Sequence, residues 1–418
     1  MAKKTATKFS FFSSHLYSLL TITITLSLIP SQIHSSTHQD DIHSLQEIKN
    51  AIDPNSISSS SYINSWDFTV DPCQSTGPQF LGILCDLPLD NSSSRVTEID
   101  LDGIGYEGFL TPAIGNLTEL TILNLNNNKF RGPIPETIGK LRKLTRLTLS
   151  ENFFTGGIPQ EIGELKKLQY LDLSANRLSG TIPSDMTGRL RSLTYLSLSN
   201  NNFSGRIQNL TGLWQLRTLD ISFNEFFGNL PNLPVSLQNI YFSHNIFSGN
   251  ITPLKDLIHL RWLDISDNRI SGVIRWDTLS LKGVTHFNVS FNRFTSIDLV
   301  NNVGQGQRLR LLEAQGNNLK GHLPVNLVSF TNLTMINLSN NQYHGTIPKE
   351  YGTKLRTSWR RLYLDHNFLT GNLPLEFTHT SAYVKGSVAN NCLKCPTNIV
   401  LCHGGQRPST ECMRQHDI

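Results

Sequence analysis

The stretch Leu144-Thr-Arg-Leu-Thr-Leu-Ser-Glu-Asn-Phe-Phe-Thr-Gly-Gly-Ile-Pro159 contains one copy of the pattern that decides the fold. Its general form is L-x-x-L-x-L-x-x-N-x-(F or L)-x-G-x-(I or L)-P, with further clear copies at 120–135 and 168–183. The asparagine returns every 21 to 26 residues, at Asn128, Asn152, Asn176, Asn201, Asn224, Asn245, Asn268, Asn292, Asn317, Asn341 and Asn367. Chance does not produce so many copies in one register, so the chain is a repeat protein.

Each position of the repeat has a structural role. In Leu144–Leu149, side chains alternate between the two faces of a short strand, so the leucines enter the core while Arg146 and Thr148 face outward. The asparagine can satisfy backbone groups that the turn would otherwise bury unpaired. Aromatic residues two positions later predict a stacked column of Phe130, Phe154, Phe203, Phe226, Phe247 and Phe294. Glycine and proline then turn the chain toward the opposite side.

Stacking of these units predicts one solenoid, although 418 residues would suffice for several ordinary domains. About twelve repeats run from Val96 to near Pro374, and the first diverges, with Ile104 in place of the asparagine. One strand per repeat, at about 4.8 Å per strand, predicts a parallel sheet of roughly 50–60 Å. That length suits a broad protein or peptide contact better than a small-molecule pocket.

Two repeats depart from the pattern. The copy around Asn292 continues as Phe294-Thr-Ser-Ile-Asp298 without the Gly-x-Ile-Pro turn, and the polar segment Leu299–Gln307 follows. We interpret it as a locally distorted turn, with a loop that helps to shape a binding site as the alternative. The copy that starts at Asn224 is only 21 residues long, which predicts a shorter outer turn.

The first 36 residues predict a signal peptide. Lys3, Lys4 and Lys8 form a basic region, no acid precedes Asp40, and the apolar stretch Tyr17–Ile29 is short for a membrane span. An uncleaved signal anchor is the alternative. Cleavage would remove three lysines and lower the formal net charge from +4 to near +1. No basic excess then remains to favour nucleic acid or an anionic membrane as a partner.

The six cysteines lie at the two ends of the chain. They are Cys73 and Cys85 early, and Cys392, Cys395, Cys402 and Cys412 late. An even number in a secreted chain favours disulfides over metal binding. The Cys392-x-x-Cys395 spacing would also fit a zinc or redox site, but the gaps to the remaining cysteines are longer than zinc sites usually have. We therefore expect disulfides, no metal and no cofactor, with the pairing of the last four cysteines open.

Eight N-x-S/T sequons predict sites of N-glycosylation in a secreted chain. They are Asn91, Asn116, Asn202, Asn209, Asn250, Asn288, Asn332 and Asn337. Part of this number arises because Asn-Leu-Ser and Asn-Leu-Thr fit the repeat. Asn288 and Asn337 fall on the inner face of the predicted sheet, where a glycan would block a partner. A partner is therefore expected nearer Tyr170–Trp262.

The outward strand positions supply the candidate binding residues. These are Arg146, Tyr170, Asp172, Tyr195, Asp220, Tyr241, Trp262 and Asp264. Exposed tyrosine and tryptophan among charged residues are typical of interface hot spots. Trp262 is the leading candidate because its register places a large apolar side chain in solvent. A solvated sheet with incidental aromatic residues is the alternative.

The sequence contains no catalytic constellation, so we expect no enzymatic activity. Gly103–Gly108 matches a dinucleotide-binding fingerprint by letter, but no long helix follows it. Asp172, Asp220 and Asp264 stand two repeats apart, or about 10 Å, beyond the separation of retaining glycosidase carboxylates. We interpret them as surface charges on a flat face. H-E-x-x-H, G-x-S-x-G and P-loop motifs are missing from the sequence.

The chain resembles the extracellular leucine-rich-repeat proteins of plants. Its turns Gly132-Pro-Ile-Pro135 and Gly180-Thr-Ile-Pro183 are similar to the plant-specific subtype. The N-terminal cap of that family is matched by Leu45, Ile48, Ile52, Trp66, Asp71-Pro-Cys73 and Gly82-Ile-Leu-Cys85, and its C-terminal cap by 391–412. The resemblance implies a right-handed, twisted solenoid with short parallel strands on the inner face, 3-10 or irregular turns outside, and caps at both ends.

The expected organisation is a signal peptide (1–36), an N-terminal cap (37–95), the solenoid (96–377) and a cysteine-containing C-terminal cap and tail (378–418). Members of the family act at the cell surface or in the wall, where they perceive peptides or hormones, act as co-receptors, or inhibit microbial wall-degrading enzymes. The chain differs from the receptors in that it has neither a membrane helix nor a kinase. It also differs from polygalacturonase inhibitors, because it is longer and has two rather than four cysteines in its N-terminal cap.

The resemblance therefore implies a secreted protein of the extracellular space or cell wall that recognises a peptide or protein partner in signalling or defence. A receptor-kinase ectodomain is among the candidate partners. The alternative function is inhibition of a secreted cell-wall-degrading enzyme. Partner type separates the two, because a signalling protein should bind a peptide or receptor ectodomain and an inhibitor should slow a wall hydrolase.

Overall fold

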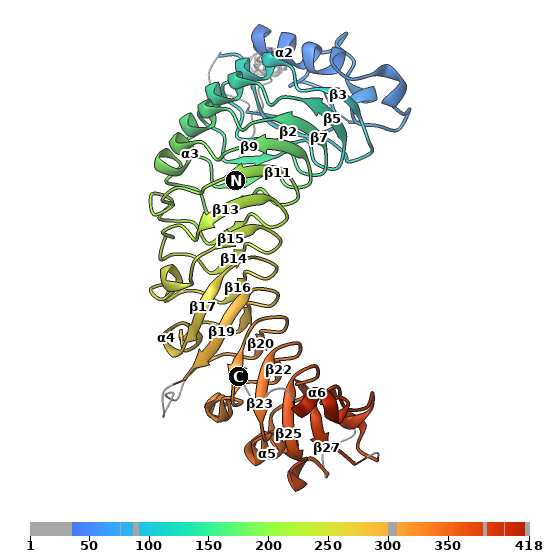
Figure 1. Ribbon diagram of the computed structural model, residues 1–418. Helices are drawn as coiled ribbons and strands as arrows, with labels where there is room; N and C mark the ends of the chain where they lie inside the picture. Colours follow the sequence, from blue (N-terminus) through green and yellow to red (C-terminus); the bar gives the residue numbers. More distant parts are fainter. Residues whose placement is uncertain are drawn as a thin grey trace, which may run out of the picture.

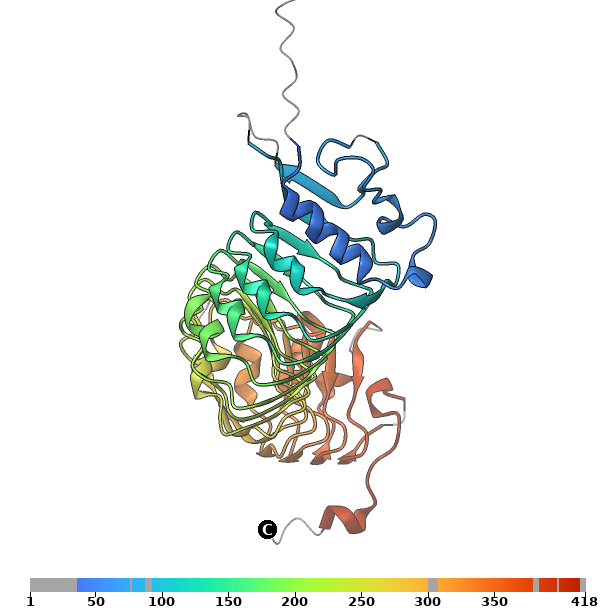
Figure 2. The ribbon, with the colours of Figure 1, turned by 90° about the horizontal axis from the view of Figure 1, so that it is seen from above.

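The computed structural model describes residues 36–75, 77–86, 92–299, 307–378, 383–396 and 398–413. Residues 1–35 of the predicted signal peptide, the sequon at Asn91 and residues 300–306 lie outside the described residues. The turns stack into one curved column (Figure 1), with the two caps at opposite ends. Successive turns are rotated relative to one another, so the column is twisted as well as curved (Figure 2).

One strand per turn forms a 14-stranded sheet on the inner side of the curve, called the main sheet below. Its strands, in spatial order, are β1 Ile83–Asp86, β2 Arg95–Asp100, β4 Ile122–Asn124, β6 Arg146–Thr148, β8 Tyr170–Asp172, β10 Tyr195–Ser197, β12 Thr218–Asp220, β14 Asn239–Tyr241, β16 Trp262–Asp264, β18 His286–Asn288, β20 Leu311–Glu313, β22 Met335–Asn337, β24 Arg361–Tyr363 and β26 Lys385–Ser387. β1 and β2 are antiparallel, whereas the pairs from β2 to β26 are parallel. Leu147 pairs with Leu123 and Leu171, and all three are fully buried. The predicted parallel sheet with inward leucines is confirmed.

The recurring asparagines form a buried ladder behind this sheet. The Oδ1 of Asn152 accepts from the backbone N–H of Phe130 at 2.9 Å, and its Nδ2 donates to the carbonyls of Leu125 and Leu149 at 2.9 and 3.3 Å. One side chain thus pairs backbone groups of two adjacent turns that would otherwise be buried without partners. Asn391 makes equivalent bonds one repeat beyond the last predicted copy.

A second, seven-stranded sheet flanks the main one in the N-terminal half. It consists of β3 Glu107–Phe109, β5 Lys129–Gly132, β7 Phe153–Gly156, β9 Arg177–Gly180, β11 Asn202–Gly205, β13 Glu225–Asn229 and β15 Ile246–Ser248. The predicted aromatic column lies behind it. Its rings stack at centroid distances of 6.2–6.4 Å in two groups, Phe130 with Phe154, and Phe203 with Phe226 and Phe247. The column is therefore not continuous, because Leu178 and Ile270 occupy the same buried position in intervening turns.

The repeat around Asn292 corrects one expectation, because it contains a strand where a distorted turn was predicted. β19 (Arg293–Asp298) pairs in parallel with β17 (Ser271–Arg275), with a register shift between Gly272 and Val273. Without glycine and proline after Phe294, the backbone stays extended and continues the ladder. A four-stranded sheet of β21 Lys320–Gly321, β23 Gln342–Gly345, β25 Phe368–Asn372 and β27 Cys392–Lys394 follows.

Short helices occupy the outer side of most turns (Figure 1). The α-helices are α2 Gln39–Asn50, α3 Ser184–Arg189, α4 Trp276–Leu279, α5 Lys349–Thr357 and α6 Ser409–Met413. The 3-10 helices are η1 Pro54–Ser56, η2 Ile63–Ser65, η3 Pro112–Asn116, η4 Glu136–Lys140, η5 Gln160–Glu164, η6 Thr252–Leu254, η7 Val325–Ser329, η8 Leu375–Phe377 and η9 Val400–Cys402. Residues 230–238 contain no helix, which confirms the shorter outer turn after Asn224.

The N-terminal cap covers the apolar end of the first turn. Trp66 is fully buried there, and a disulfide joins Cys73 to Cys85. The buried carboxylate of Asp41 accepts from the Arg95 guanidinium at 2.9 and 3.0 Å. This bidentate ion pair fixes the cap helix α2 to the start of β2, because the buried carboxylate of Asp41 would be costly without the partly exposed guanidinium of Arg95.

The C-terminal cap closes the ladder. Its disulfides are Cys392–Cys412 and Cys395–Cys402, which settles the pairing that the spacing left open. The amide of Gln406 takes the place of the next asparagine, since its Oε1 accepts from the N–H of Asn391 at 3.2 Å and its Nε2 donates to the carbonyl of Val388 at 3.2 Å. With β26 and Asn391, the regular solenoid extends one turn past residue 377.

Candidate ligand-binding face

The candidate binding residues lie in two adjacent columns on the main sheet, with their side chains directed away from the core. Strand pairing places Arg146, Tyr170, Tyr195 and Trp262 in the first column, and Asp172, Asp220, Tyr241 and Asp264 in the second. The predicted register is thus correct at each of these strands. Because the sheet is continuous, side chains far apart in the sequence form one surface.

The N-terminal part of this face carries a three-layer stack. The guanidinium carbon of Arg146 lies 4.6 Å from the ring centroid of Tyr170, and the rings of Tyr170 and Tyr195 stack with centroids 4.2 Å apart. Burial raises the pKa of the Tyr195 hydroxyl, and the nearby charge of Asp172 raises it further. Both rings are already held in place, so the two tyrosine side chains would lose little conformational entropy when a ligand packs on them.

A shallow pocket of about 540 Å³ adjoins this stack. Arg146 and Tyr170 of the stack line it together with carboxylates from neighbouring turns, among them Glu98, Asp100 and Glu151. The N-terminal end of the face therefore combines a cation over an aromatic ring with several acids, which favours a ligand carrying both polar and apolar groups.

A second aromatic cluster lies near the centre of the face. Trp262 stacks on His286 with ring centroids 3.7 Å apart, and Tyr241 lies 6.2 Å from Trp262. The indole retains 36% of its surface exposed, which is enough to contact a ligand. Burial lowers the pKa of His286, and the positive charge of Arg310 lowers it further. The imidazole is therefore neutral near pH 7 and extends the apolar platform of Trp262.

The aspartates are more than the surface charges predicted from the sequence. The Oδ1 of Asp264 accepts from the backbone N–H and the hydroxyl of Ser266 at 3.0 and 2.6 Å. Equivalent bonds join Asp172 to Ser174 and Asp220 to Ser222. Each half-buried carboxylate thus holds the turn that follows its strand, which fixes a negative charge beside the aromatic residues.

Sequence reasoning omitted His286 and Glu313 from the site. Both occupy the same outward columns, and this register was the available signal, but the sequon at Asn288 predicted a glycan in that stretch. The Oδ1 of Asn288 accepts from the N–H and hydroxyl of Ser290 at 3.1 and 2.5 Å, as Asp264 does in the preceding turn. Burial raises the pKa of Glu313, and the charge of Asp264 adds to the effect.

The described sequons fall into two groups. The exposed group consists of Asn116, Asn202, Asn209, Asn250 and Asn332. Asn288 and Asn337 are half-buried on the main sheet, where the register had predicted them. The exposed group lies outside the two columns of the candidate ligand-binding face.

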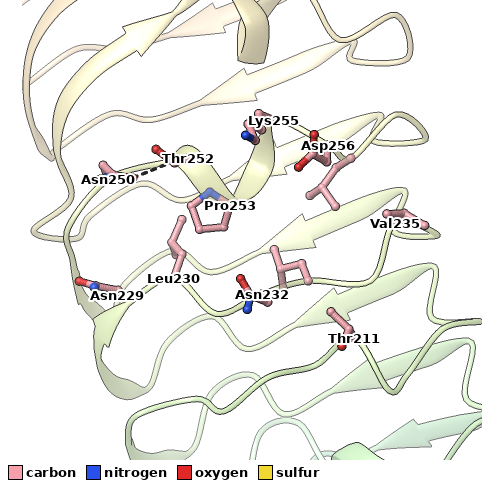
Figure 3. Close-up of a pocket in the computed structure, with 12 residues that line it drawn as sticks. Thr211, Asn229, Leu230, Asn232, Val235, Asn250, Thr252, Pro253, Lys255 and Asp256 are labelled. Atoms are coloured by element: carbon pink, nitrogen blue, oxygen red, sulfur yellow. Dashed lines mark hydrogen bonds between the residues drawn. The ribbon is translucent and has the colours of Figure 1, made fainter.

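A larger hollow lies away from this face, where the short repeat lacks an outer helix (Figure 3). It has a volume of about 590 Å³, and Leu230, Val235 and Pro253 contribute to its lining. The sequon Asn250-Ile-Thr252 also lines it, and the Oδ1 of Asn250 accepts from the N–H of Thr252 at 3.0 Å. Glycosylation would place sugar in this hollow, so we do not assign it as a ligand site.

Within the described part of the chain, no three His, Cys, Asp or Glu side chains gather closely enough to hold a metal ion. None of the described helices has the length and apolar character that crossing a membrane requires.

Comparison with known families identifies the class of protein. The leucine-rich repeat region matches residues 95–366, and the leucine-rich repeat N-terminal domain matches residues 38–86. The chain therefore belongs to the leucine-rich-repeat family, as its pattern predicts. A search of curated proteins gives no match.

Several solved structures of plant receptor ectodomains are similar. PEPR1 in complex with AtPEP1 has a TM-score of 0.73 and 28% identity, over 85% of this chain and 52% of that one. The plant peptide hormone receptor RGFR1 in complex with RGF2 has a TM-score of 0.65 and 28% identity, over 78% and 52%. GASSHO1/SCHENGEN3 from Arabidopsis thaliana, in complex with CASPARIAN STRIP INTEGRITY FACTOR 2, has a TM-score of 0.53 and 25% identity, over 71% and 44%. The chain thus spans about half the length of these receptor chains.

Proposed function

We propose that this chain is an extracellular recognition protein whose inner face binds a peptide or protein ligand between Arg146 and Asp264. The observation that carries the proposal is the pair of preformed aromatic stacks, Arg146–Tyr170–Tyr195 and Tyr241–Trp262–His286, on one continuous sheet. Rigid aromatic side chains flanked by charges are the groups that dominate binding energy at protein interfaces.

The shape of the face favours an extended ligand. The two stacks are separated by the strand β12, so a molecule that contacts both must follow the axis of the solenoid. The three similar receptor structures described above are peptide complexes, which supports peptide binding over the alternative of enzyme inhibition. A small metabolite is too short to span these turns, whereas a peptide or protein is long enough.

The proposed location is extracellular, in the wall or intercellular fluid, and the proposed role is in signalling or defence. The disulfides and the exposed sequons support this location. Three disulfides persist in oxidising compartments. Exposed sequons fit passage through the secretory route. A receptor-kinase ectodomain is a candidate partner, because the 14-stranded sheet is long enough to contact a protein as well as a peptide.

Affinity capture tests the proposal. The secreted, glycosylated chain is immobilised, incubated with extracellular fluid, and the eluate identified by mass spectrometry. A peptide or receptor ectodomain that binds the wild type, but not a Tyr170→Ala/Trp262→Ala variant, supports the proposal. Capture of a wall hydrolase, whose rate the chain lowers, would replace it with the inhibitor function.

Trp262→Ala alone should weaken binding of the captured ligand by more than about 1 kcal/mol of binding free energy, because truncation removes the most exposed ring of the central platform. Thermal stability should change little, since the indole contributes no core contact. Trp214→Ala is the matched control, because Trp214 is 58% exposed and lies outside the main sheet. Unchanged affinity in Trp262→Ala, measured by calorimetry, would remove Trp262 from the site.

A further inference from the structure

A third column of residues borders the candidate ligand-binding face; it lies one residue before each strand from β4 to β24 and includes Thr97 within β2. We call it the entry column. In the C-terminal half it consists of Arg217, Gln238, Arg261, Thr285, Arg310, Thr334 and Arg360. Each residue's N–H donates to the carbonyl of its counterpart in the preceding turn at 2.7–2.9 Å, so the column is continuous. Arginine occupies every second turn.

The N-terminal half of the entry column contains no charge. Its residues are Thr97, Thr121, Thr145, Gln169 and Thr194. The threonine hydroxyls bond within the column, since Thr121 donates to the carbonyl of Thr97 at 2.9 Å and Thr145 donates to that of Thr121 at 3.0 Å. Threonine alone thus supplies the side-chain hydrogen bonds within the column. The fold therefore does not require arginine at this position.

The arginines of the entry column are free to bind a ligand. All four side chains are exposed, and no hydrogen bond or ion pair of their guanidinium groups occurs within the described residues. Leu311 pairs with His286 in the main sheet, so Arg310 precedes the residue that lies beside the central aromatic platform. Beside the entry column, the next column continues that platform with the half-buried Leu311 and Met335.

The spacing of these arginines matches one peptide conformation. Two turns of the solenoid correspond to about 9.6 Å, at about 4.8 Å per strand. A polyproline II helix has three residues per turn and rises about 3.1 Å per residue, so its side chains at positions i and i+3 lie on one ridge about 9.3 Å apart. An extended β-strand, which rises about 3.3 Å per residue with a period of two, has no such match.

We propose that the entry column binds a peptide in polyproline II conformation that carries a carboxylate at every third position. The carboxylate ridge contacts Arg217, Arg261, Arg310 and Arg360, while a ridge of proline or other apolar residues packs on Trp262, His286, Leu311 and Met335. This inference rests on the proposed function, whose ligand class it specifies. Guanidinium groups suit carboxylates because their donors are fixed in a plane.

The opposite edge of the face sets the orientation of such a peptide. Asp220, Asp264 and Glu313 lie three strand residues beyond the entry-column arginines, or roughly 10 Å across the sheet. A carboxylate on the ridge that packs over Trp262 would therefore approach these acids and be repelled. The face discriminates between an acid at every third position and the same number of acids placed consecutively.

Synthetic probes test the proposal directly. The first is a fluorescein-labelled peptide of four Glu-Pro-Pro repeats, capped at both ends. The second has the same composition with its four glutamates consecutive, and the third consists of four Lys-Pro-Pro repeats. We expect the spaced acidic peptide to bind the full chain at least roughly ten-fold more tightly than either other probe, and added salt to weaken it. Equal affinity for the spaced and consecutive peptides, or no binding of the spaced peptide at millimolar concentration, overturns the proposal.

A pair of matched variants completes the test. Arg261→Gln/Arg310→Gln should weaken the spaced peptide roughly ten-fold, since each exposed ion pair contributes modestly. Arg142→Gln/Arg191→Gln removes two exposed arginines outside the entry column and should leave affinity unchanged. If the ligand captured from extracellular fluid requires Trp262 but not these arginines, the proposed function stands and the present inference fails. If it requires neither, the proposed function fails.

Discussion

At the scale of single residues, side-chain amides and carboxylates replace hydrogen-bond partners that a tightly wound backbone lacks. Asn152 and its counterparts bond two turns at once inside the solenoid. At the end of its strand, the carboxylate of Asp264 accepts from the backbone N–H of Ser266. The amide of Asn288 makes the equivalent bond in the next turn, so an amide can substitute for a carboxylate there. Negative charge on the inner face is therefore not required by the fold at these positions.

Asn224→Ala should destabilise the solenoid by roughly 1–3 kcal/mol, because backbone groups would be left buried without partners. Its Oδ1 accepts from the N–H of Phe203 at 3.0 Å, and its Nδ2 donates to the carbonyls of Leu198, Ile221 and Ser222 at 3.0, 3.2 and 3.1 Å. Thermal melting measures the effect, with the exposed Asn232→Ala as control. An unchanged melting curve would contradict the role of the ladder.

Glu313→Gln should stabilise the protein near neutral pH, with a gain that shrinks in acid. Burial and the charge of Asp264 raise the pKa of Glu313 above its ordinary value of 4.5, so its ionised form opposes folding. This penalty is present above the folded-state pKa and disappears as pH falls and the carboxyl group is protonated. Melting temperatures across pH, with the exposed Glu225→Gln as control, test the sign. A gain that grows in acid would refute it.

At the scale of elements, no strand of the main sheet after β2 is longer than three residues among those described. Such strands are stable only because each pairs with its neighbours and, from β4 to β24, buries a central apolar residue against theirs. The two ends have a neighbour on one side only, and covalent and polar caps complete them. The N-terminal end is completed by the disulfide Cys73–Cys85 and the Asp41–Arg95 ion pair. The C-terminal end is completed by two disulfides and the amide of Gln406.

The two C-terminal disulfides should differ in their effect on the cap. Cys392 and Cys412 are separated by 20 residues, whereas Cys395 and Cys402 are separated by 7. A longer loop loses more chain entropy on closure, so removing the first disulfide should destabilise the cap by about 1 kcal/mol more than removing the second. Hydrogen exchange of β26 and β27 in the paired Cys→Ala variants measures this. The reverse order would show that packing, rather than loop length, decides cap stability.

At the scale of the whole molecule, the curve of the column presents one face on which three columns of side chains run along the axis. Threonines border its N-terminal half and arginines its C-terminal half. Five sequons are exposed elsewhere, whereas the two on this face are half-buried. This distribution is consistent with the proposed binding of a ligand on the inner face.

Glycan mapping should find sugar at Asn116, Asn202, Asn209, Asn250 and Asn332 but not at Asn288 or Asn337. The side chains of Asn288 and Asn337 bond the serines of their own sequons and are half-buried, so a glycan there would disrupt the turn and cover the face. Peptide mass spectrometry of the secreted protein measures occupancy. Occupied Asn288 would exclude a ligand from the centre of the face and contradict the proposed site.

The sequence determined the architecture of this protein, because one local pattern repeats. The spacing of leucines and asparagines specified parallel strands, the inner sheet and the ladder, and all are confirmed. It also placed Arg146, Tyr170 and Trp262 in outward columns, since a period of two decides the face of a strand wherever its partner is known. A repeat removes the usual difficulty of fold prediction, because every contact is with the adjacent turn.

Only the tertiary structure decided what depends on side chains from different turns. Trp262 stacks on His286, and Asp264 contributes to the raised pKa of Glu313, although the residues of each pair are more than 20 positions apart. The alignment of the entry-column arginines likewise depends on the pairing of successive turns. Disulfide pairing and the strand β19 were likewise open, because cap geometry and the register of an extended segment do not follow the repeat. Local periodicity fixes the direction of each side chain, whereas distances between turns fix its neighbours and its chemistry.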